Sequence, residues 1–309
     1  PLAVGMSGNF RQMKRRILNI AVFRKETLYQ KMRALIIYLV ISAVFIGCTP
    51  ILSIDASTQS VYHFSDTDKN ISLLDISETF GTYDGSFVLY DNNLDSWKIY
   101  DLEEATKRIP PESTYKIYDA LLGLESGIIT PEHSSMTWNG DAFPFPSWEA
   151  DQDLNSAMQN SVNWYFQAID SQLGINRVQE FLNKIEYGNQ TTSSNLDLYW
   201  SDFSLKISPL EQVTLLKKFN TNEFHLNFQN VFSVKNAIKI ASTPNGNFYG
   251  KTGTGRVNGQ DINGWFIGYV ETSDNSYYFA TNIQSDSNAT GKKAFEITSD
   301  ILKKLHIWN

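Results

Sequence analysis

The chain has 309 residues, enough for one large domain or two smaller ones, and 42% of them are hydrophobic, so a sizeable core can form. Its single cysteine, Cys48, excludes an intramolecular disulfide. The formal net charge of −7 is unevenly distributed: residues 1–33 hold eight Lys or Arg and one Glu, a net charge of +7, so the rest of the chain carries −14. A basic N-terminal segment followed by an acidic remainder indicates that the two parts lie in different environments, and we expect no nucleic-acid partner.

An uncharged apolar stretch of 21 residues, 34–54, separates the basic and acidic parts. As a helix it would be about 31 Å long, close to the hydrocarbon thickness of about 30 Å in a bilayer. A buried core helix is the alternative, but a core helix of this length usually shows a polar stripe. Because Lys and Arg precede the stretch, we predict a transmembrane helix at 34–54, with residues 1–33 in the cytoplasm and the acidic part outside the cell.

The basic region is too long for a signal peptide, and the chain begins with Pro1 rather than Met. We therefore expect the sequence to be the C-terminal piece of a longer membrane protein. Residues 55–81 are rich in Ser, Thr, Asp and Asn, which is typical of an extracytoplasmic linker with room for an edge strand. A folded domain is predicted over residues 82–309.

The pattern within this domain changes along the chain. Strands are expected at 86–90 and 97–100, joined by a turn. Helices are expected where apolar residues recur at helical spacing, at 113–125, 153–173, 177–185 and 209–219. The last elements are predicted to be three strands and an amphipathic closing helix, at 248–252, 264–271, 277–284 and 292–305. Strands at both ends and helices between them indicate an α+β domain, with an antiparallel sheet that joins the two ends.

Two motifs whose side chains could take part in a reaction lie far apart in the sequence. Ser113 and Lys116 are one helical turn apart at the start of an apolar helix. By itself this spacing is explained by an N-cap serine and a solvated lysine. The second motif, Lys251-Thr252-Gly253-Thr254-Gly255, lies between two predicted strands. Its glycines would let a ligand approach the backbone, and its lysine would supply a positive charge for a carboxylate.

In this order and at this spacing, the two motifs resemble the penicillin-recognising serine family of β-lactamases, penicillin-binding proteins and their relatives. That family has a third element between them, for which the sequence offers three candidates. Ser273-Asp274-Asn275 follows the second motif in a predicted hairpin turn, and residues 193–195 lie in a polar loop. We therefore choose Ser161-Val162-Asn163, which is predicted to lie in a helix.

Further motifs resemble class D β-lactamases over about 82–309, and they lie at 143–148, 187–189, Trp200 with 205–212, and 265–268. Together with the apolar span and the basic segment, they make the chain most similar to the BlaR1/MecR1 family of β-lactam sensor-transducers. The resemblance implies a β-lactamase/transpeptidase-like fold, a β-lactam antibiotic as ligand and a place in the bacterial cell membrane. It also implies a zinc metalloprotease part, preceding this chain, that acts on a cytoplasmic repressor. The four histidines form no His-Glu-x-x-His, so we expect no zinc site or other cofactor in this chain.

The resemblance also implies roles for single residues. Ser113 would be the nucleophile that opens the β-lactam ring and becomes an acyl ester. Lys116 would be the base, N-carboxylated as a carbamate formed with CO₂, which an apolar pocket favours because desolvation exposes the free amine. Ser161 would relay a proton to the leaving nitrogen. Trp200 would contact Lys116 or its carbamate, with simple core packing as the alternative.

The second motif would bind the antibiotic. Lys251 and Thr252, with Gly253 and Thr254 beside them, would hold the carboxylate of the ligand. The backbone N–H groups of Ser113 and Thr254 would form the oxyanion hole.

Asn163 departs from the class D hydrolases, which usually have valine at this position. Its amide would stabilise protonated Lys116 and disfavour the carbamate, so that the acyl adduct persists. We therefore expect a receptor that is acylated once. A membrane-anchored class D β-lactamase is the alternative, and a D,D-peptidase is a less favoured one, since penicillin-binding proteins also use Ser-x-Asn.

Overall fold

The computed structural model of the chain describes residues 60–65, 69–193 and 195–309. The chain divides into two compact units, 1–54 and 55–309, and all described residues belong to the second. The basic segment at 1–33 and the helix expected at 34–54 lie outside the described residues. In the ranges that the structure describes, no helix is long and apolar enough to cross a membrane.

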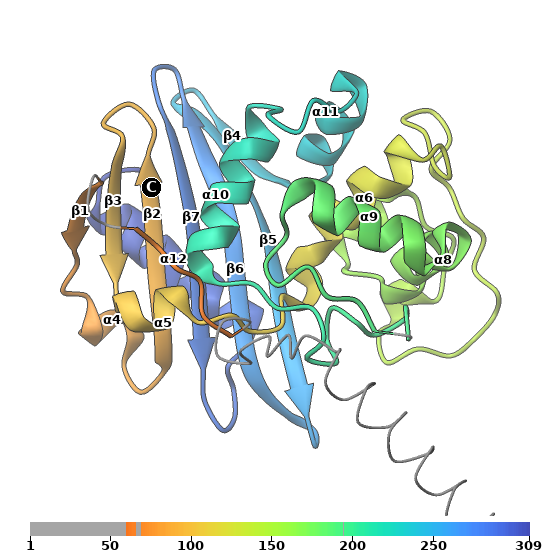
Figure 1. The fold of residues 1–309 in the computed structure, drawn as a ribbon, viewed down its shortest axis with the longest axis horizontal. Helices are drawn as coiled ribbons and strands as arrows, with labels where there is room; N and C mark the ends of the chain where they lie inside the picture. Colours follow the sequence, from red (N-terminus) through yellow and green to blue (C-terminus); the bar gives the residue numbers. More distant parts are fainter. Residues whose placement is uncertain (1–59, 66–68, 194) are drawn as a thin grey trace, which may run out of the picture. The chain divides into compact units, whose positions relative to one another are not determined.

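A seven-stranded sheet is the centre of the described unit, with the strand order β1-β3-β2-β7-β6-β5-β4. Strand β2 pairs with β7 in antiparallel register, so strands from the two ends of the domain meet inside one sheet (Figure 1). This confirms the predicted α+β class. The strands are β1 (Asn70–Leu73), β2 (Asp84–Asp91), β3 (Ser96–Tyr100), β4 (Lys239–Thr243), β5 (Gly246–Val257), β6 (Gln260–Thr272) and β7 (Ser276–Gln284).

The helices form two groups around this sheet. Helix α12 (Gly291–Lys304) packs on one face and α10 (Pro209–Asn220) on the other, while α6, α8, α9 and α11 gather at the side of the sheet where β4 and β5 lie (Figure 1). The remaining bounds are α4 (Ser77–Phe80), α5 (Leu102–Thr106), α6 (Lys116–Glu125), α7 (Leu154–Gln159), α8 (Asn163–Leu173), α9 (Ile175–Ile185) and α11 (Phe228–Ala237), with 3₁₀ turns η1 (Glu112–Tyr115) and η2 (Pro146–Trp148).

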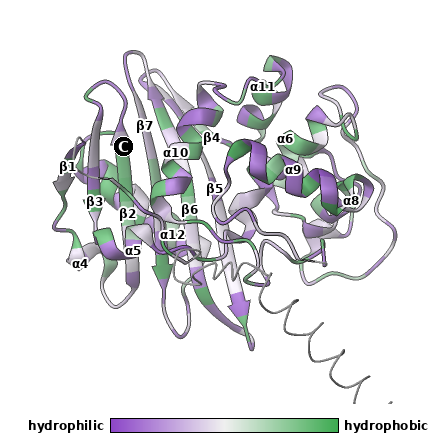
Figure 2. Ribbon diagram, viewed as in Figure 1, coloured by the Kyte–Doolittle hydropathy of each residue, from purple (hydrophilic) through white to green (hydrophobic). Residues whose placement is uncertain are grey.

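Alternation along the strands produces one core on each face of the sheet. On β2, Phe87 and Leu89 face the α12 side, whereas Val88 and Tyr90 belong to the core on the other side. Figure 2 shows hydrophobic residues along the central strands and a mixture of hydrophobic and hydrophilic residues on the surface helix α9. The sheet therefore separates two cores, and the candidate site lies at the edge of the core on the helical side.

Several expectations differ from the structure. The strand β1 and the helix α4 precede the expected domain start at residue 82, and Phe80 is buried. The sheet is not wholly antiparallel, because β1 pairs with β3 in parallel register. The helix expected at 153–173 is two helices, α7 and α8, separated by a turn. The elements α5, α11 and β4 were not predicted, because none of them has a strong local pattern of hydrophobic residues.

Candidate active site

The serine and the lysine of the first motif face each other at the start of α6. Ser113 lies in the 3₁₀ turn η1, and Lys116 is the first residue of α6. Lys116 Nζ lies 2.9 Å from Ser113 Oγ and donates a second hydrogen bond of 2.7 Å to Asn163 Oδ1. The lysine is buried, with 1% of its surface exposed. It is therefore not the solvated surface cation that the simpler interpretation required.

Ser161 reaches the site from a break between two helices. Its backbone has a φ of +53°, in the left-handed region, and it lies between the end of α7 and the start of α8. The sequence prediction placed it inside a continuous helix, which is wrong. The turn directs the hydroxyl of Ser161 toward Lys251, whose Nζ donates a hydrogen bond to Ser161 Oγ. No local sequence pattern indicated this turn.

The second motif lies on β5, alongside η1. A Cβ atom on Gly253 would be 3.1 Å from Pro111 O and 3.3 Å from Ser113 N, so a glycine lets the strand approach the turn closely. Beside this contact is a cleft of about 450 Å³. Its lining includes Ser113, Ser161, Asn163, Thr252, Gly253 and Thr254. The structure thus brings all three sequence motifs to one opening.

Trp200 lies under this opening. It is buried and its ring is stacked with that of Tyr115, with 6.2 Å between ring centroids. Lys116 Nζ lies 5.6 Å from the centroid of the Trp200 ring and 5.6 Å from that of Phe166. Trp200 O also accepts a hydrogen bond of 3.1 Å from Glu112 N, directly before the serine. Trp200 therefore both packs in the core and contacts the lysine.

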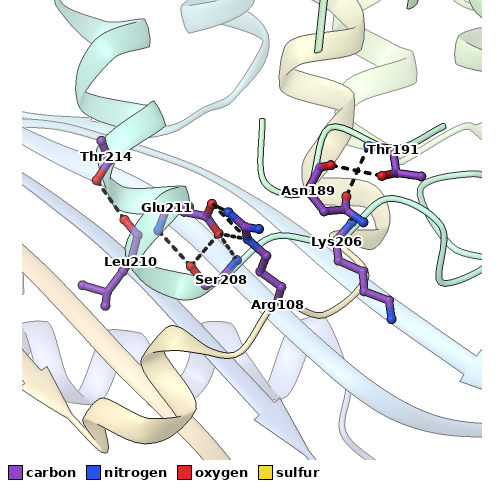
Figure 3. A network of polar contacts seen from close by, with 8 residues as sticks. All are labelled: Arg108, Asn189, Thr191, Lys206, Ser208, Leu210, Glu211 and Thr214. Carbon is purple, nitrogen blue, oxygen red and sulfur yellow. Dashed lines mark hydrogen bonds and ion pairs between the residues drawn. The ribbon is translucent and has the colours of Figure 1, made fainter. Parts of the chain in front are cut away.

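A partly buried ion pair fixes the start of α10 against the segment that leads to Ser113. The guanidinium of Arg108 donates to both oxygens of Glu211, with N–O distances of 2.6 to 3.1 Å (Figure 3). Glu211 Oε2 accepts from the backbone N and the hydroxyl of Ser208, which is the N-cap of α10. Backbone hydrogen bonds between Ile109 and Ile207, of 3.1 and 2.9 Å, continue this connection toward the site.

Asn189 holds the other end of the segment that carries Trp200. Its Oδ1 accepts from Lys206 N at 2.9 Å (Figure 3). Its Nδ2 donates to Ser204 O at 2.7 Å. The preceding Gly188 has a φ of +52°, and a Cβ atom there would lie 1.9 Å from Lys206 O. Glycine is thus required for this close approach.

Burial controls the charge on both lysines. Burial lowers the pKa of Lys116 to about 8, and the carboxyls of Asp119, Glu112 and Asp170 offset part of this shift. Burial and the nearby charge of Lys116 lower the pKa of Lys251 well below its usual range. At neutral pH a neutral amine is therefore accessible within hydrogen-bond distance of the Ser113 hydroxyl.

Some residues at the site were missed in the sequence. Glu112 is buried next to the serine, has a φ of +52° and lies 3.3 Å from Asn263 Nδ2. Burial raises the pKa of Glu112 to about 8. The rim of the cleft also includes Arg256, which was missed, and Phe145 and Trp148 of the motif at 143–148, which the sequence had indicated. The position of Glu112 directly before Ser113 was the one available signal, and nothing local predicted its burial.

The rejected alternatives lie elsewhere. Residues Asp274 and Asn275 form the hairpin turn between β6 and β7, where Asn275 Nδ2 donates to Asp91 Oδ1 at 2.8 Å. Ser193 Oγ is hydrogen-bonded to Asp202 and to the backbone of Asn195. No group of three or more His, Cys, Asp or Glu side chains with metal-binding potential occurs among the described residues.

Comparison with known proteins agrees with this geometry. Residues 85–303 match the family model of the penicillin binding protein transpeptidase domain. The chain belongs to this family. It is 43% identical over 305 residues to the regulatory protein BlaR1 of Bacillus licheniformis and 37% identical over 295 residues to the methicillin resistance mecR1 protein of Staphylococcus aureus. These alignments cover 98% and 96% of this chain, which places it in the BlaR1/MecR1 branch.

Solved structures of this family have the same fold. The C-terminal domain of the Bacillus licheniformis BlaR penicillin-receptor is 45% identical, with a TM-score of 0.76, and the match covers 78% of this chain and 99% of that domain. The class D β-lactamase BAT-2 is 36% identical, with a TM-score of 0.72, covering 76% of this chain and 97% of the other. The chain spans about half the length of the BlaR1 and mecR1 proteins that it matches.

Proposed function

We propose that this chain carries the sensor domain of a β-lactam receptor, in which an antibiotic acylates Ser113 once and the adduct persists. One observation carries the proposal. Lys116 Nζ is held between Ser113 Oγ, at 2.9 Å, and Asn163 Oδ1, at 2.7 Å. The first contact suits proton removal from a nucleophile. The second contact is a hydrogen bond from the lysine to an amide oxygen. In a hydrolase, the same lysine must be available as the base that activates water.

Acylation would begin when the neutral amine of Lys116 takes the proton of the Ser113 hydroxyl. The oxygen then attacks the lactam carbonyl carbon, a C–O bond forms, and the C–N bond of the ring breaks. The leaving nitrogen needs a proton, which the hydroxyl of Ser161 would relay by giving up its own proton and taking one from Lys251 Nζ. The hydrogen bond from Lys251 Nζ to Ser161 Oγ supports this step, since it orients that hydroxyl beside a second buried lysine.

The antibiotic would be bound along β5. Its carboxylate would lie near Lys251 and Thr252 and would restore the charge that burial removes from Lys251. The developing oxyanion would accept hydrogen bonds from the backbone N–H groups of Ser113 and Thr254. The close approach of Gly253 to Ser113 N supports this pairing of strand and turn.

Lys116 is the proposed switch between acylation and hydrolysis. A neutral amine adds to CO₂, a C–N bond forms, one proton is released, and a carbamate anion results. That base would activate water and release the adduct. The amide of Asn163 favours the bare ammonium instead, and a hydrogen bond to a charged group contributes about 1.5–3 kcal/mol. This is enough to change a balanced carbamate equilibrium by tenfold or more.

The rest of the receptor is inferred from the relatives. A membrane helix at 34–54, a cytoplasmic segment at 1–33 and a linker at 55–81 would connect domain 82–309, outside the cell, to a zinc metalloprotease part. That part would act on a cytoplasmic repressor of resistance genes. The relatives with which the chain aligns over most of its length, BlaR1 and mecR1, are named as regulatory and resistance proteins, which supports this arrangement.

The test is intact-mass spectrometry of the detergent-solubilised chain after a single exposure to penicillin. We expect one adduct with the full mass of the antibiotic, still present after hours. A chromogenic cephalosporin should give one equivalent of product and then stop. Continued turnover would instead establish the alternative of a membrane-anchored class D β-lactamase, for which the match to BAT-2 is the supporting observation. Cleavage of a D-Ala-D-Ala peptide would indicate a D,D-peptidase.

A further inference from the structure

Two buried carboxyl groups lie beneath the candidate site, and the acylation mechanism does not use them. Asp119 is on α6, one turn after Lys116, and Asp170 is on α8, about two turns after Asn163. Both side chains are 0% exposed. A fully charged carboxylate at such a depth is unfavourable unless donors or cations surround it.

The hydrogen-bond donors around these carboxyls are too few for two carboxylates. Neither oxygen of Asp119, nor Oδ2 of Asp170, has a donor among the described residues. Oδ1 of Asp170 accepts one long hydrogen bond of 3.4 Å from the hydroxyl of Tyr199. The two carboxyls come from helices that pack against each other, α6 and α8, and each shifts the pKa of the other. Two neighbouring carboxyls bond to each other only when one is protonated, so one shared proton satisfies the most oxygen atoms.

The electrostatic surroundings favour retention of that proton. Burial, and then the charge of Asp170, raise the pKa of Asp119 well above its usual range. Burial also raises the pKa of Asp170, to about 8. Other titratable groups interact with the pair or with Lys116 from the neighbouring elements, and these are Glu112 and Tyr115 on η1, Tyr165 on α8, Asp197 and Tyr199 in the segment before α10, and Lys251 on β5.

We propose that Asp119 and Asp170 share one proton and that the single negative charge left on the pair holds Lys116 as an ammonium. Within the described residues, Lys116 donates hydrogen bonds only to neutral oxygens, those of Ser113 and Asn163. Its counter-charge therefore acts at longer range, through a medium of low dielectric constant. A carbamate on Lys116 would place a second negative charge in the same pocket, which the pair opposes. Asp119 and Asp170 are thus positioning residues that act through Lys116, and this inference rests on the proposed function.

A charge-conserving and a charge-removing variant separate the possibilities. In Asp119→Asn the amide donates to the Asp170 carboxylate, imitates the shared proton and keeps one negative charge. The double variant Asp119→Asn/Asp170→Asn has no charge. The rate of acylation by penicillin is measured against pH in the full chain, in CO₂-free buffer. We expect the acid limb of the pH–rate profile to move to lower pH by roughly one unit in the double variant. A nearby negative charge raises a lysine pKa, so its removal lowers the pKa of Lys116. The limb of Asp119→Asn should stay in place.

The amount of carbamate on Lys116 is a second measurement of the same effect, because loss of the negative charge on the pair should favour both the neutral amine and its carbamate. With ¹³C-bicarbonate, NMR should show more carbamate on Lys116 in the double variant than in the native chain or in Asp119→Asn. A limb that also moves in Asp119→Asn would mean that this substitution removes a negative charge, as it does when both carboxyls are charged, and the limb of the double variant would then move further. A limb that moves in neither would mean that both were protonated. Either result overturns the inference.

An infrared measurement tests the shared proton even if the double variant does not fold or the native chain is not acylated. Glu112→Gln first removes the third buried carboxyl whose pKa is raised. This parent should show the C=O stretch of one protonated carboxyl at neutral pH, and adding Asp119→Asn should remove it. A band that persists in the second variant, or that is missing in the parent, contradicts the shared proton. Lack of acylation in the native chain contradicts the proposed function instead, so the two failures are distinguishable.

Discussion

The two faces of the central sheet carry cores of opposite character. The core under α12 is almost entirely apolar, with Phe279, Ile297 and Ile301 among its members, and one buried polar contact, between the hydroxyls of Thr281 and Thr298 at 2.6 Å. The core on the other face contains the buried amine of Lys116, the buried carboxyls of Asp119 and Asp170, and several phenol hydroxyls without partners among the described residues. Stability and reactivity are therefore separated: one face supplies packing, and the other maintains unfavourable polar burial that shifts pKa values.

The largest expected effect is on the reactive face. Ser113→Ala should abolish covalent labelling by penicillin, because no other described hydroxyl lies within hydrogen-bond distance of Lys116 Nζ. Intact-mass spectrometry measures the adduct directly. The unfolding temperature should stay close to that of the native chain, since the serine is only half-buried at the surface of the cleft. An unchanged adduct on this variant would remove Ser113 from the mechanism.

The second effect is on the apolar face. Ile301→Ala should lower the free energy of unfolding by about 2–5 kcal/mol, through lost burial and the cavity left between α12 and the sheet. Chemical denaturation measures this loss. The matched control Ile301→Val should lower it by only about 0.5–1.5 kcal/mol. Both variants, while folded, should be acylated at the native rate. A changed acylation rate would show that the two faces are coupled.

The third effect sharpens the distinction between receptor and hydrolase. Asn163→Val removes the amide oxygen that lies 2.7 Å from Lys116 Nζ. We expect the acyl adduct to disappear about tenfold faster or more, since the lost hydrogen bond to a charged group is worth about 1.5–3 kcal/mol. The lifetime is followed by intact mass, and ¹³C-bicarbonate NMR follows the carbamate. Equal lifetimes and equal carbamate signals would show that Asn163 is not the switch.

The smallest expected effect is the pH dependence of acylation. Burial lowers the pKa of Lys116 to about 8, so its neutral amine becomes more abundant as the pH rises through that value. The acylation rate should increase about fivefold between pH 7 and pH 8 and level off above pH 9, following the neutral fraction. Stopped-flow measurement in CO₂-free buffer tests this. A rate that falls with rising pH in this range would contradict Lys116 as the base.

The sequence predicted most of the architecture because its signals are local. Alternating strands and amphipathic helices fixed the class, and the bounds of α9, α10 and α12 agree with prediction within two residues. The turn at Ser161 was not predicted, because a single residue with a positive φ between two helices has no sequence pattern of its own. The edge strand β1 was predicted only as an option, since a strand of four residues has little pattern of its own.

By itself, the sequence determined which chemical groups this protein has and the order in which they occur: a hydroxyl and an amine one turn apart, a Ser-x-Asn, and a lysine before two glycines on a strand. Each of those patterns spans only a few residues, so it can be recognised without knowledge of the fold. Only the tertiary structure decided that Lys116 is buried and that Asp119, Asp170 and Glu112 lie beside it. The physical reason is that desolvation and charge coupling depend on what surrounds a group in space. Residues from α6, α8, β5 and the segment before α10 create that environment together, and no single stretch of the chain contains it.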